Sequence, residues 1–207
     1  MIASEDAARA YIRNGWGPAA YEKCQRLADA LATENRRQNL VSAVSLASVW
    51  QRHIADSAQL LQHSAAGTGE WVDIGTGAGF PGLVIAMLAP ERNVLLVEPR
   101  TKRVEWLRYA VQELALENCR VEPRKAEKLS LNSTADVVSA RAVAPMADLL
   151  QMTKHLFGRN TQGVFLKGKT VAEELAQLGP TERQRYVFHV KPSLTSSDSR
   201  IIVAQLR

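Results

Sequence analysis

The chain changes its hydrophobic period once, near residue 69. Before that point apolar residues recur at spacings of three and four, which predicts helices within residues 4–63. Ser45 is of the type that caps helix N-termini, so we expect the second helical stretch to begin there, after a polar turn at residues 35–38. Residues 1–66 are therefore expected to form a helical layer.

Beyond this point short apolar runs alternate with amphipathic segments, as in a parallel β-sheet with crossover helices. The runs predict strands at 71–75, 93–99, 119–123, 135–142 and 163–168, with helices at 81–89, 101–116 and 146–157. Two further strands, at 185–192 and 199–206, are separated only by a polar segment and predict an antiparallel hairpin. The expected fold is α/β, with a seven-stranded mixed sheet in residues 67–207, one compact unit with the helical layer, and a loop at 65–69.

Composition is that of an ordinary folded protein, with 46% hydrophobic and 23% charged residues. The longest apolar run, residues 83–89, is far shorter than the roughly 20 residues of a membrane span. The chain does not start with a basic segment followed by an apolar stretch, so export is not expected. Cys24 and Cys119 have no metal-ligand spacing. We expect a cytoplasmic protein without a metal site or a membrane partner.

The net charge of +5 is distributed unevenly along the chain. Residues 1–70 are balanced, whereas residues 151–207 carry nine basic and four acidic side chains. A basic surface favours a polyanionic partner such as nucleic acid, although a solvated basic face is the alternative interpretation.

A glycine-rich segment, VDIGTGAGFPG at 72–82, lies between the first predicted strand and the helix after it. Such a loop brings backbone close to a ligand and directs helix N–H groups at it. The spacing from Gly77 to Gly82 matches the dinucleotide motif G-x-G-x-x-G, but counted from Gly75, which follows the strand directly, the third glycine position is occupied by Phe80. A nicotinamide nucleotide is therefore disfavoured.

Two carboxylates flank this segment. Asp73, near the end of the first strand, suits a ligand's ammonium group and would repel a pyrophosphate. Glu98, at the end of the second strand, is placed to accept ribose hydroxyls, a feature common to several nucleotide-like ligands. A cationic, ribose-containing ligand is favoured.

The segment from Asp73 to Gly79 resembles the first motif of class I S-adenosylmethionine-dependent methyltransferases. The resemblance is reinforced by the terminal hairpin, since that class has an antiparallel seventh strand beside the fifth. It implies S-adenosyl-L-methionine as cofactor. The residues expected to contribute to the cofactor site are Asp73, Gly75, Gly77, Gly79, Phe80, Glu98, Ala126, Glu127 and Arg141.

Six ordered segments narrow the resemblance: NLVSA (39–43), RHIADS (52–57), VDIGTGAGFPG (72–82), KRVEWL (102–107), SARAVAP (139–145) and LKGK (166–169). Together they resemble the glucose-inhibited division protein B family, the bacterial small-subunit methyltransferase G family that acts on guanine N7 in 16S ribosomal RNA. The resemblance implies 16S RNA or the small ribosomal subunit as partner, not DNA, and a monomeric enzyme. The basic residues it implies at an RNA-facing mouth are Lys102, Arg103, Lys167, Lys169 and Arg200.

The resemblance places Arg141 where the target base would enter. Its guanidinium could hold guanine O6 or a phosphate, the alternative being an internal ion pair with Asp136 or Asp148. Guanine N7 carries a lone pair, so no base is needed, and the sequence offers no nucleophile triad. His53 and Asp56 are expected to anchor the helical layer near the glycine loop. The alternative functions are a class I enzyme acting on a small molecule or protein, a nicotinamide oxidoreductase and a non-catalytic RNA-binding assembly factor.

Overall fold

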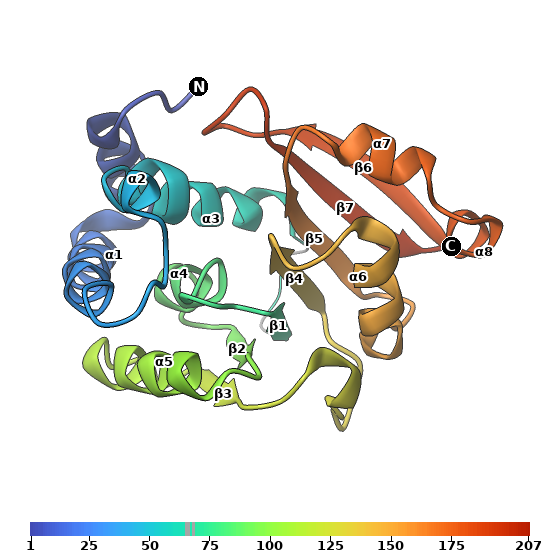
Figure 1. Cartoon of the computed structure of the whole chain (residues 1–207), viewed down its shortest axis with the longest axis horizontal. Helices are drawn as coiled ribbons and strands as arrows, with labels where there is room; N and C mark the ends of the chain where they lie inside the picture. The colour runs from blue at the N-terminus through green and yellow to red at the C-terminus, as the bar shows by residue number, and fades with distance from the viewer. Residues whose placement is uncertain (65–66, 68) are drawn as a thin grey trace.

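The computed structural model describes residues 1–64, 67 and 69–207, which include a seven-stranded sheet of order β3-β2-β1-β4-β5-β7-β6 (Figure 1). Its strands are β1 Glu70–Ile74, β2 Asn93–Val97, β3 Cys119–Glu122, β4 Val137–Arg141, β5 Gln162–Lys167, β6 Tyr186–Pro192 and β7 Arg200–Leu206. The strands β1 to β5 are parallel, and β7 runs antiparallel to both of its neighbours. The predicted mixed sheet with a terminal antiparallel hairpin is confirmed.

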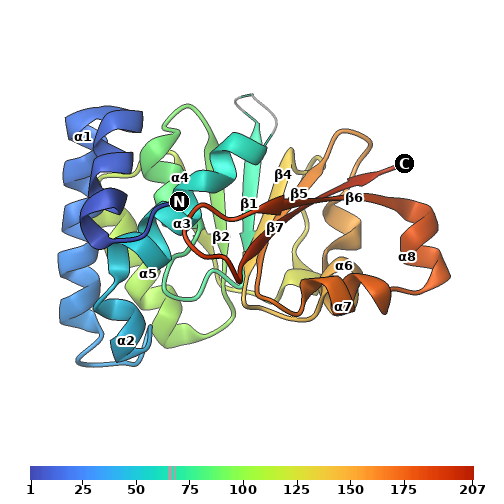
Figure 2. The ribbon, with the colours of Figure 1, turned by 90° about the horizontal axis from the view of Figure 1, so that it is seen from above.

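Helices cover the two faces of the sheet in separate layers (Figure 2). One apolar core contains residues of α4 Gly82–Leu88 and α5 Thr101–Glu113 together with the N-terminal helices. The other contains residues of α6 Met146–Thr153 and α7 Val171–Ala176. Because the central strands are buried on both sides, apolar residues occupy successive positions instead of alternating ones, interrupted inside the sheet by the hydrogen-bonded Asp73 and Ser139.

The N-terminal layer begins with α1 Glu5–Glu34, which packs against α4 and α5. Its backbone leaves the helical conformation at Gly17, where φ is 80°. The polar turn predicted at residues 35–38 is confirmed and ends this helix.

The second helical stretch consists of several short pieces: α2 Ala43–Leu46, the π-helix η1 Trp50–Ala55, α3 Asp56–Ala58 and the 3₁₀ helix η2 Gln59–His63. The prediction that Ser45 caps this stretch is wrong. The cap of α2 is Ser42, whose hydroxyl accepts a hydrogen bond from the Ser45 N–H at 3.2 Å.

Two short helices, α7 and α8 Pro180–Arg185, lie in a region where the sequence predicted none. Each has six residues, too few for a helical period to be visible in the sequence. The predicted loop at 65–69 falls on residues of which 65, 66 and 68 lie outside the described part. The division at residues 66 and 67 stays a prediction. Within the described residues, no helix has the length and apolar character needed to cross a membrane.

Candidate active site

The glycine segment turns sharply where β1 ends. Gly75, Gly77 and Gly79 have φ values of 60°, 60° and 103°, which side chains other than glycine rarely adopt. A Cβ on Gly75 would lie 2.8 Å from Cγ2 of Val143. The loop therefore approaches the segment after β4 more closely than any other residue type would permit.

The carboxylates of Asp73 and Glu98 accept hydrogen bonds from N–H groups of the glycine segment. Asp73 is fully buried, and its two oxygens accept hydrogen bonds from the Gly82 N–H at 2.9 Å and the Ser139 hydroxyl at 2.7 Å. Burial raises the pKa of Asp73 to about 6. Glu98 accepts a hydrogen bond from the Gly77 N–H at 3.1 Å. The structure thus gives Asp73 a role in ordering the loop, and its expected place in the cofactor site stays a prediction.

A small cavity of about 340 Å³ lies at the carboxyl ends of β1 and β2. It is lined by Ile74, Gly75, Val97, Glu98, Pro99, Arg100, Arg103, Arg124, Lys125, Ala126, Glu127, Ala142, Val143 and Met152. Glu98 is nearly buried, with Nη1 of Arg103 4.0 Å from its carboxylate. Ala126 and Glu127 come from the 3₁₀ helix η3 Ala126–Lys128.

The small cavity brings together Gly75, Glu98, Ala126 and Glu127 of the expected cofactor residues. It does not include Asp73, Gly77, Gly79, Phe80 or Arg141. Gly77 and Gly79 act through the shape of the loop, and the Phe80 side chain is buried against the helical layer.

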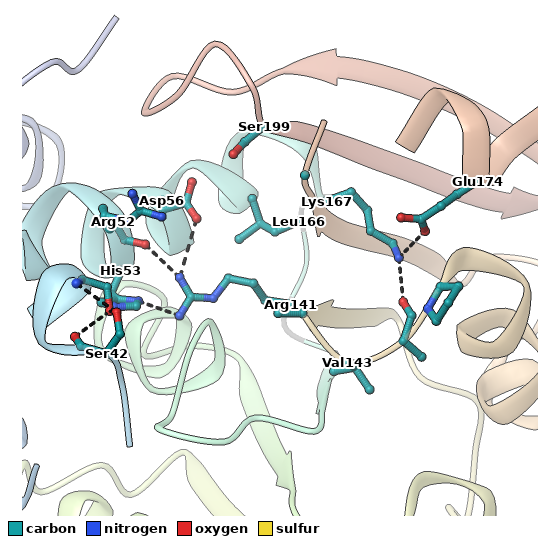
Figure 3. A pocket seen from close by; sticks show the side chains of 15 residues that line it. Ser42, Arg52, His53, Asp56, Arg141, Val143, Leu166, Lys167, Glu174 and Ser199 are labelled. Carbon is teal, nitrogen blue, oxygen red and sulfur yellow. Dashed lines mark hydrogen bonds and ion pairs between the residues drawn. The ribbon is translucent and has the colours of Figure 1, made fainter. Parts of the chain in front are cut away.

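A large cavity of about 660 Å³ opens beside it, lined by Ser42, Ser45, Arg52, His53, Asp56, Arg141, Ala142, Val143, Ala144, Pro145, Leu166, Lys167, Gly168, Glu174 and Ser199 (Figure 3). Ala142 and Val143 line both cavities. Ala142 has a φ of 54°, so the chain turns abruptly after β4. Two backbone-linked residues thus form the boundary between the cavities.

Arg141 ends β4 and extends into the large cavity (Figure 3). Its Nη1 donates to the Arg52 carbonyl at 2.8 Å, its Nη2 lies 2.6 Å from Nδ1 of His53, and Asp56 Oδ2 is 3.7 Å from Nη1. The alternative pairing with Asp136 or Asp148 is wrong.

Neither of those two aspartates reaches Arg141, for different reasons. Asp136 precedes β4 and accepts a hydrogen bond from the Glu70 N–H at 2.8 Å, at the opposite end of the sheet. Asp148 is exposed on α6. The carboxylate that Arg141 meets is instead supplied by a helix of the N-terminal layer.

His53 connects this layer to the glycine loop. Its ring stacks on Phe80 with centroids 4.8 Å apart and planes inclined by 22°. The Arg141 guanidinium lies 5.3 Å from the centre of the same Phe80 ring. The expectation that the RHIADS segment anchors the helical layer near the loop is confirmed for His53.

The five basic residues expected at an RNA-facing mouth occupy different environments. Lys102 and Lys169 are exposed, and Arg103 lies in the small cavity beside Glu98. Lys167 lines the large cavity, but its ammonium donates to Glu174 at 2.6 Å and to the Ala144 carbonyl at 2.7 Å.

The fifth residue, Arg200, donates to the carbonyls of Ser197 and Ser199 at 2.5 and 2.8 Å. Sequence reasoning missed Arg52, an exposed residue that lines the large cavity. The sequence signal that could have identified Arg52 is its position as the first residue of the RHIADS segment.

A parallel sheet with an antiparallel β7 beside β5, and a glycine loop after β1, is the fold of class I S-adenosylmethionine-dependent methyltransferases. The chain is similar to an S-adenosylmethionine-dependent methyltransferase from Aquifex aeolicus, with a TM-score of 0.62 and 16% identity over 84% of this chain and 98% of that one. It is also similar to a ribosomal protein L11 methylase from Lactobacillus delbrueckii subsp. bulgaricus, with a TM-score of 0.58 and 11% identity over 74% and 77% of the two chains. The predicted class is confirmed.

Sequence comparison narrows the class to one family. The family model for rRNA small subunit methyltransferase G matches residues 20–201. Proteins of that name from Erythrobacter litoralis and Novosphingobium aromaticivorans are 48% and 42% identical, covering 100% and 99% of this chain and 99% and 90% of theirs. The chain belongs to the rRNA small subunit methyltransferase G family, as the resemblance predicted, and is a methyltransferase that uses S-adenosylmethionine.

The residues of the small cavity fit this cofactor. Its volume of about 340 Å³ lies within the range of small-molecule sites. Glu98 stands at the end of β2, where an acidic side chain can accept both hydroxyls of a ribose. Gly75 leaves room that a side chain would fill, because its Cβ would meet Val143. Ile74, Val97 and Met152 add apolar surface for a flat ring.

Proposed function

We propose that the protein transfers the methyl group of S-adenosylmethionine to N7 of a guanine in 16S ribosomal RNA of the small subunit. The observation that carries the proposal is the pair of cavities that share Ala142 and Val143. One has the chemistry of a cofactor site, and the other is larger and is lined by the basic residues Arg52, Arg141 and Lys167. The name of the related proteins supports ribosomal RNA as the acceptor.

The reaction chemistry agrees with the side chains in the large cavity. When bound, S-adenosylmethionine supplies a methyl carbon made electrophilic by the adjacent sulfonium. Guanine N7 presents a lone pair and carries no proton, so the protein does not need a general base. Burial, together with the charges of Arg141 and Arg52, lowers the pKa of His53 to about 3, which makes its ring a poor proton acceptor at neutral pH. Positioning of the two reactants is then the main contribution of this chain.

Individual residues have distinct roles in this proposal. Gly75, Glu98, Ala126 and Glu127 bind the cofactor, and Arg141 holds the guanine or an adjoining phosphate. The base has to leave its stack to enter the large cavity, so a loop or incompletely folded RNA suits the site.

Exposed basic residues complete the RNA surface. Arg52 lines the large cavity, Lys102 is exposed on α5 and Lys169 is exposed after β5, and all three are suited to binding RNA phosphates. We propose further that the enzyme acts as a monomer in the cytoplasm, on naked RNA or on the small subunit.

The test uses radiolabelled S-adenosylmethionine with three acceptors: naked 16S RNA, intact small subunits and a small-metabolite pool. Labelled RNA is digested to nucleosides and separated. The proposal requires label in 7-methylguanosine, and the better of the two RNA substrates shows how much ribosomal protein the enzyme needs. Gly75→Val is the control, since a side chain there would collide with Val143 and prevent cofactor binding.

The other outcomes each indicate a different protein. Label only in the metabolite pool would make the chain a small-molecule methyltransferase. Cofactor binding and RNA binding without any transfer would favour an assembly factor. Label in another nucleoside would retain the RNA substrate and reject N7 as the acceptor atom.

A further inference from the structure

Arg141 is held by a part of the chain that lies almost ninety residues earlier. Its guanidinium meets the Arg52 carbonyl, the His53 ring and the Asp56 carboxylate, all from the segment where η1 passes into α3 (Figure 3). The turns of a π-helix are wider than those of an α-helix, and π-helical segments occur frequently at functional sites. Here that segment presents three acceptors, from Arg52, His53 and Asp56, to one cation.

The contact with His53 fixes the protonation of both partners. Arginine is always protonated and only donates, so Nδ1 of His53 must accept and the ring must be neutral, with its proton on Nε2. The lowered pKa of His53, caused by burial and by Arg141 and Arg52, agrees with a neutral ring. Nε2 is buried and has no hydrogen-bond partner among the described residues.

Asp56 is held in turn by the segment between β6 and β7. Its Oδ1 accepts from the Thr195 hydroxyl at 2.6 Å and from the Gln59 amide at 2.9 Å. The Ser193 hydroxyl contacts both of these neighbours, at 3.0 and 3.1 Å. The carboxylate therefore has a fixed position from which Oδ2 faces Arg141.

This arrangement is costly for folding. A buried N–H without a partner destabilises a protein, and so does a guanidinium removed from water. A contact that only joined the helical layer to β4 would need neither an unpaired buried N–H nor a desolvated guanidinium. Arg141 keeps N–H donors beyond those bound to Arg52 and His53, and its side chain remains 19% exposed.

We propose that His53 and Asp56 are positioning residues, which fix the orientation of Arg141 at the boundary between the two cavities and thereby set the rate of methyl transfer. The inference rests on the proposed function. His53 aligns the guanidinium through Nδ1 and through the shared Phe80 ring, and Asp56 supplies the opposing charge. Neither residue itself touches the reacting atoms.

The experiment is a double-mutant cycle on methyl transfer to small-subunit RNA, with Asp56→Asn, Arg141→Ala and the double variant. Asp56→Asn removes the charge but keeps an amide oxygen for Thr195 and Gln59. We expect it to lower kcat by about tenfold, with unchanged affinity for S-adenosylmethionine and a nearly unchanged Tm. In the double variant, kcat should equal that of Arg141→Ala, because Asp56 acts through Arg141.

Glu5→Gln is the matched control. Glu5 accepts hydrogen bonds from the N–H groups of Trp50 and Gln51 at 3.1 and 2.7 Å, so it supports the same π-helix without contact to Arg141. We expect its kcat to stay near that of the wild type, and any loss it causes to multiply with that of Arg141→Ala.

A second pair of variants tests His53. His53→Asn retains an acceptor near the position of Nδ1, whereas His53→Leu does not, so Asn should preserve more of the wild-type kcat. Multiplying losses in the Asp56–Arg141 cycle, or equal kcat for the two His53 variants, would overturn the positioning role. A wild-type protein that binds the cofactor and methylates no RNA would instead overturn the proposed function.

Discussion

Arg141 and Lys167 end the neighbouring strands β4 and β5, and both cations enter the large cavity. Each meets a carboxylate from a helix, Asp56 for Arg141 and Glu174 for Lys167. The distances differ, since Lys167 lies 2.6 Å from Glu174 while Arg141 stays 3.7 Å from Asp56. The close ion pair neutralises the charge of Lys167 within the protein, whereas Arg141 keeps N–H donors that the proposed function assigns to the substrate.

The surroundings of Glu174 support this distinction. Its carboxylate also accepts from the Met146 N–H at 2.9 Å, at the first residue of α6. Lys167 and Glu174 thus join β5, α6 and α7 on one side of the sheet. Two basic side chains at equivalent ends of adjacent strands therefore differ: Lys167 connects helices to the sheet, and the proposed function places Arg141 in the acceptor site.

The largest expected effect follows from removing Arg141. Arg141→Ala should lower kcat by about 100-fold, because the base loses its positioning group, while the affinity for S-adenosylmethionine changes little. Single-turnover transfer and cofactor titration measure the two quantities. Arg141→Lys should recover little, since an ammonium cannot reproduce the planar fork that meets Arg52 and His53. An equal loss of cofactor affinity and turnover would remove Arg141 from the acceptor site.

Lys167→Met should act mainly on stability. It leaves the half-buried Glu174 carboxylate without its cation, so the free energy of unfolding should fall by about 1 kcal/mol. Urea denaturation measures this loss, and adding Glu174→Gln should recover part of it. A 100-fold loss of kcat at unchanged stability would show that Lys167 works in the transfer step as Arg141 does.

Salt dependence separates Lys167 from its neighbour Lys169. From the sequence both were expected to contact RNA, but only Lys169 is exposed and Lys167 is paired. Lys169→Ala should reduce the slope of log affinity against log salt by roughly 0.7 to 0.9, whereas Lys167→Met should leave the slope unchanged. The measurement is RNA binding at several salt concentrations. The opposite result would reverse the two roles.

The smallest expected effect is on the free energy of unfolding, to which Glu174 and Asp56 should contribute with opposite pH dependence. Burial raises the pKa of Glu174, but the hydrogen bond and charge of Lys167 outweigh it and hold the pKa below its ordinary value. Its stabilisation is therefore present above the ordinary glutamate pKa and is lost as the pH falls through the lowered one. Burial raises the pKa of Asp56, and the charge of Arg141 opposes this only in part. The contribution of Asp56 to stability is fully present below the ordinary aspartate pKa and is lost as the pH rises through the raised pKa of the folded protein.

Unfolding free energies between about pH 3 and pH 7 test these signs. The stability of the wild type relative to Glu174→Gln should grow with pH, and its stability relative to Asp56→Asn should shrink. Parallel pH dependences for the two variants would show that the carboxylates have similar environments.

The two cavities also differ in how far the sequence could predict them. The small cavity is built around the ends of β1 and β2, where Gly75 and Glu98 follow apolar runs at a recognisable spacing. Local sequence determines that geometry, so the sequence could predict that Gly75 and Glu98 lie together, and their role as cofactor residues stays a prediction. The hydrogen bonds of Asp73 to Gly82 and Ser139 could not be predicted in the same way, because they form only when the loop and β4 pack against β1.

The large cavity is assembled from segments far apart in the chain, from Ser42 to Ser199. The partners of Arg141 lie almost ninety residues away, and Glu174 belongs to a helix too short to leave a periodic pattern. No spacing in the sequence encodes these contacts, because they depend on how the layers pack. The family resemblance identified Arg141 and Lys167 as important, but only the fold distinguishes their environments.

Ala142 and Val143 line both cavities, so in the proposed reaction the methyl donor and the acceptor base meet along a single stretch of main chain. The course of that stretch depends on backbone torsions, among them the left-handed φ of Ala142. A substitution at another wall of the large cavity, such as Leu166 or Ser199, would change the space offered to a base and leave this stretch of main chain as it is.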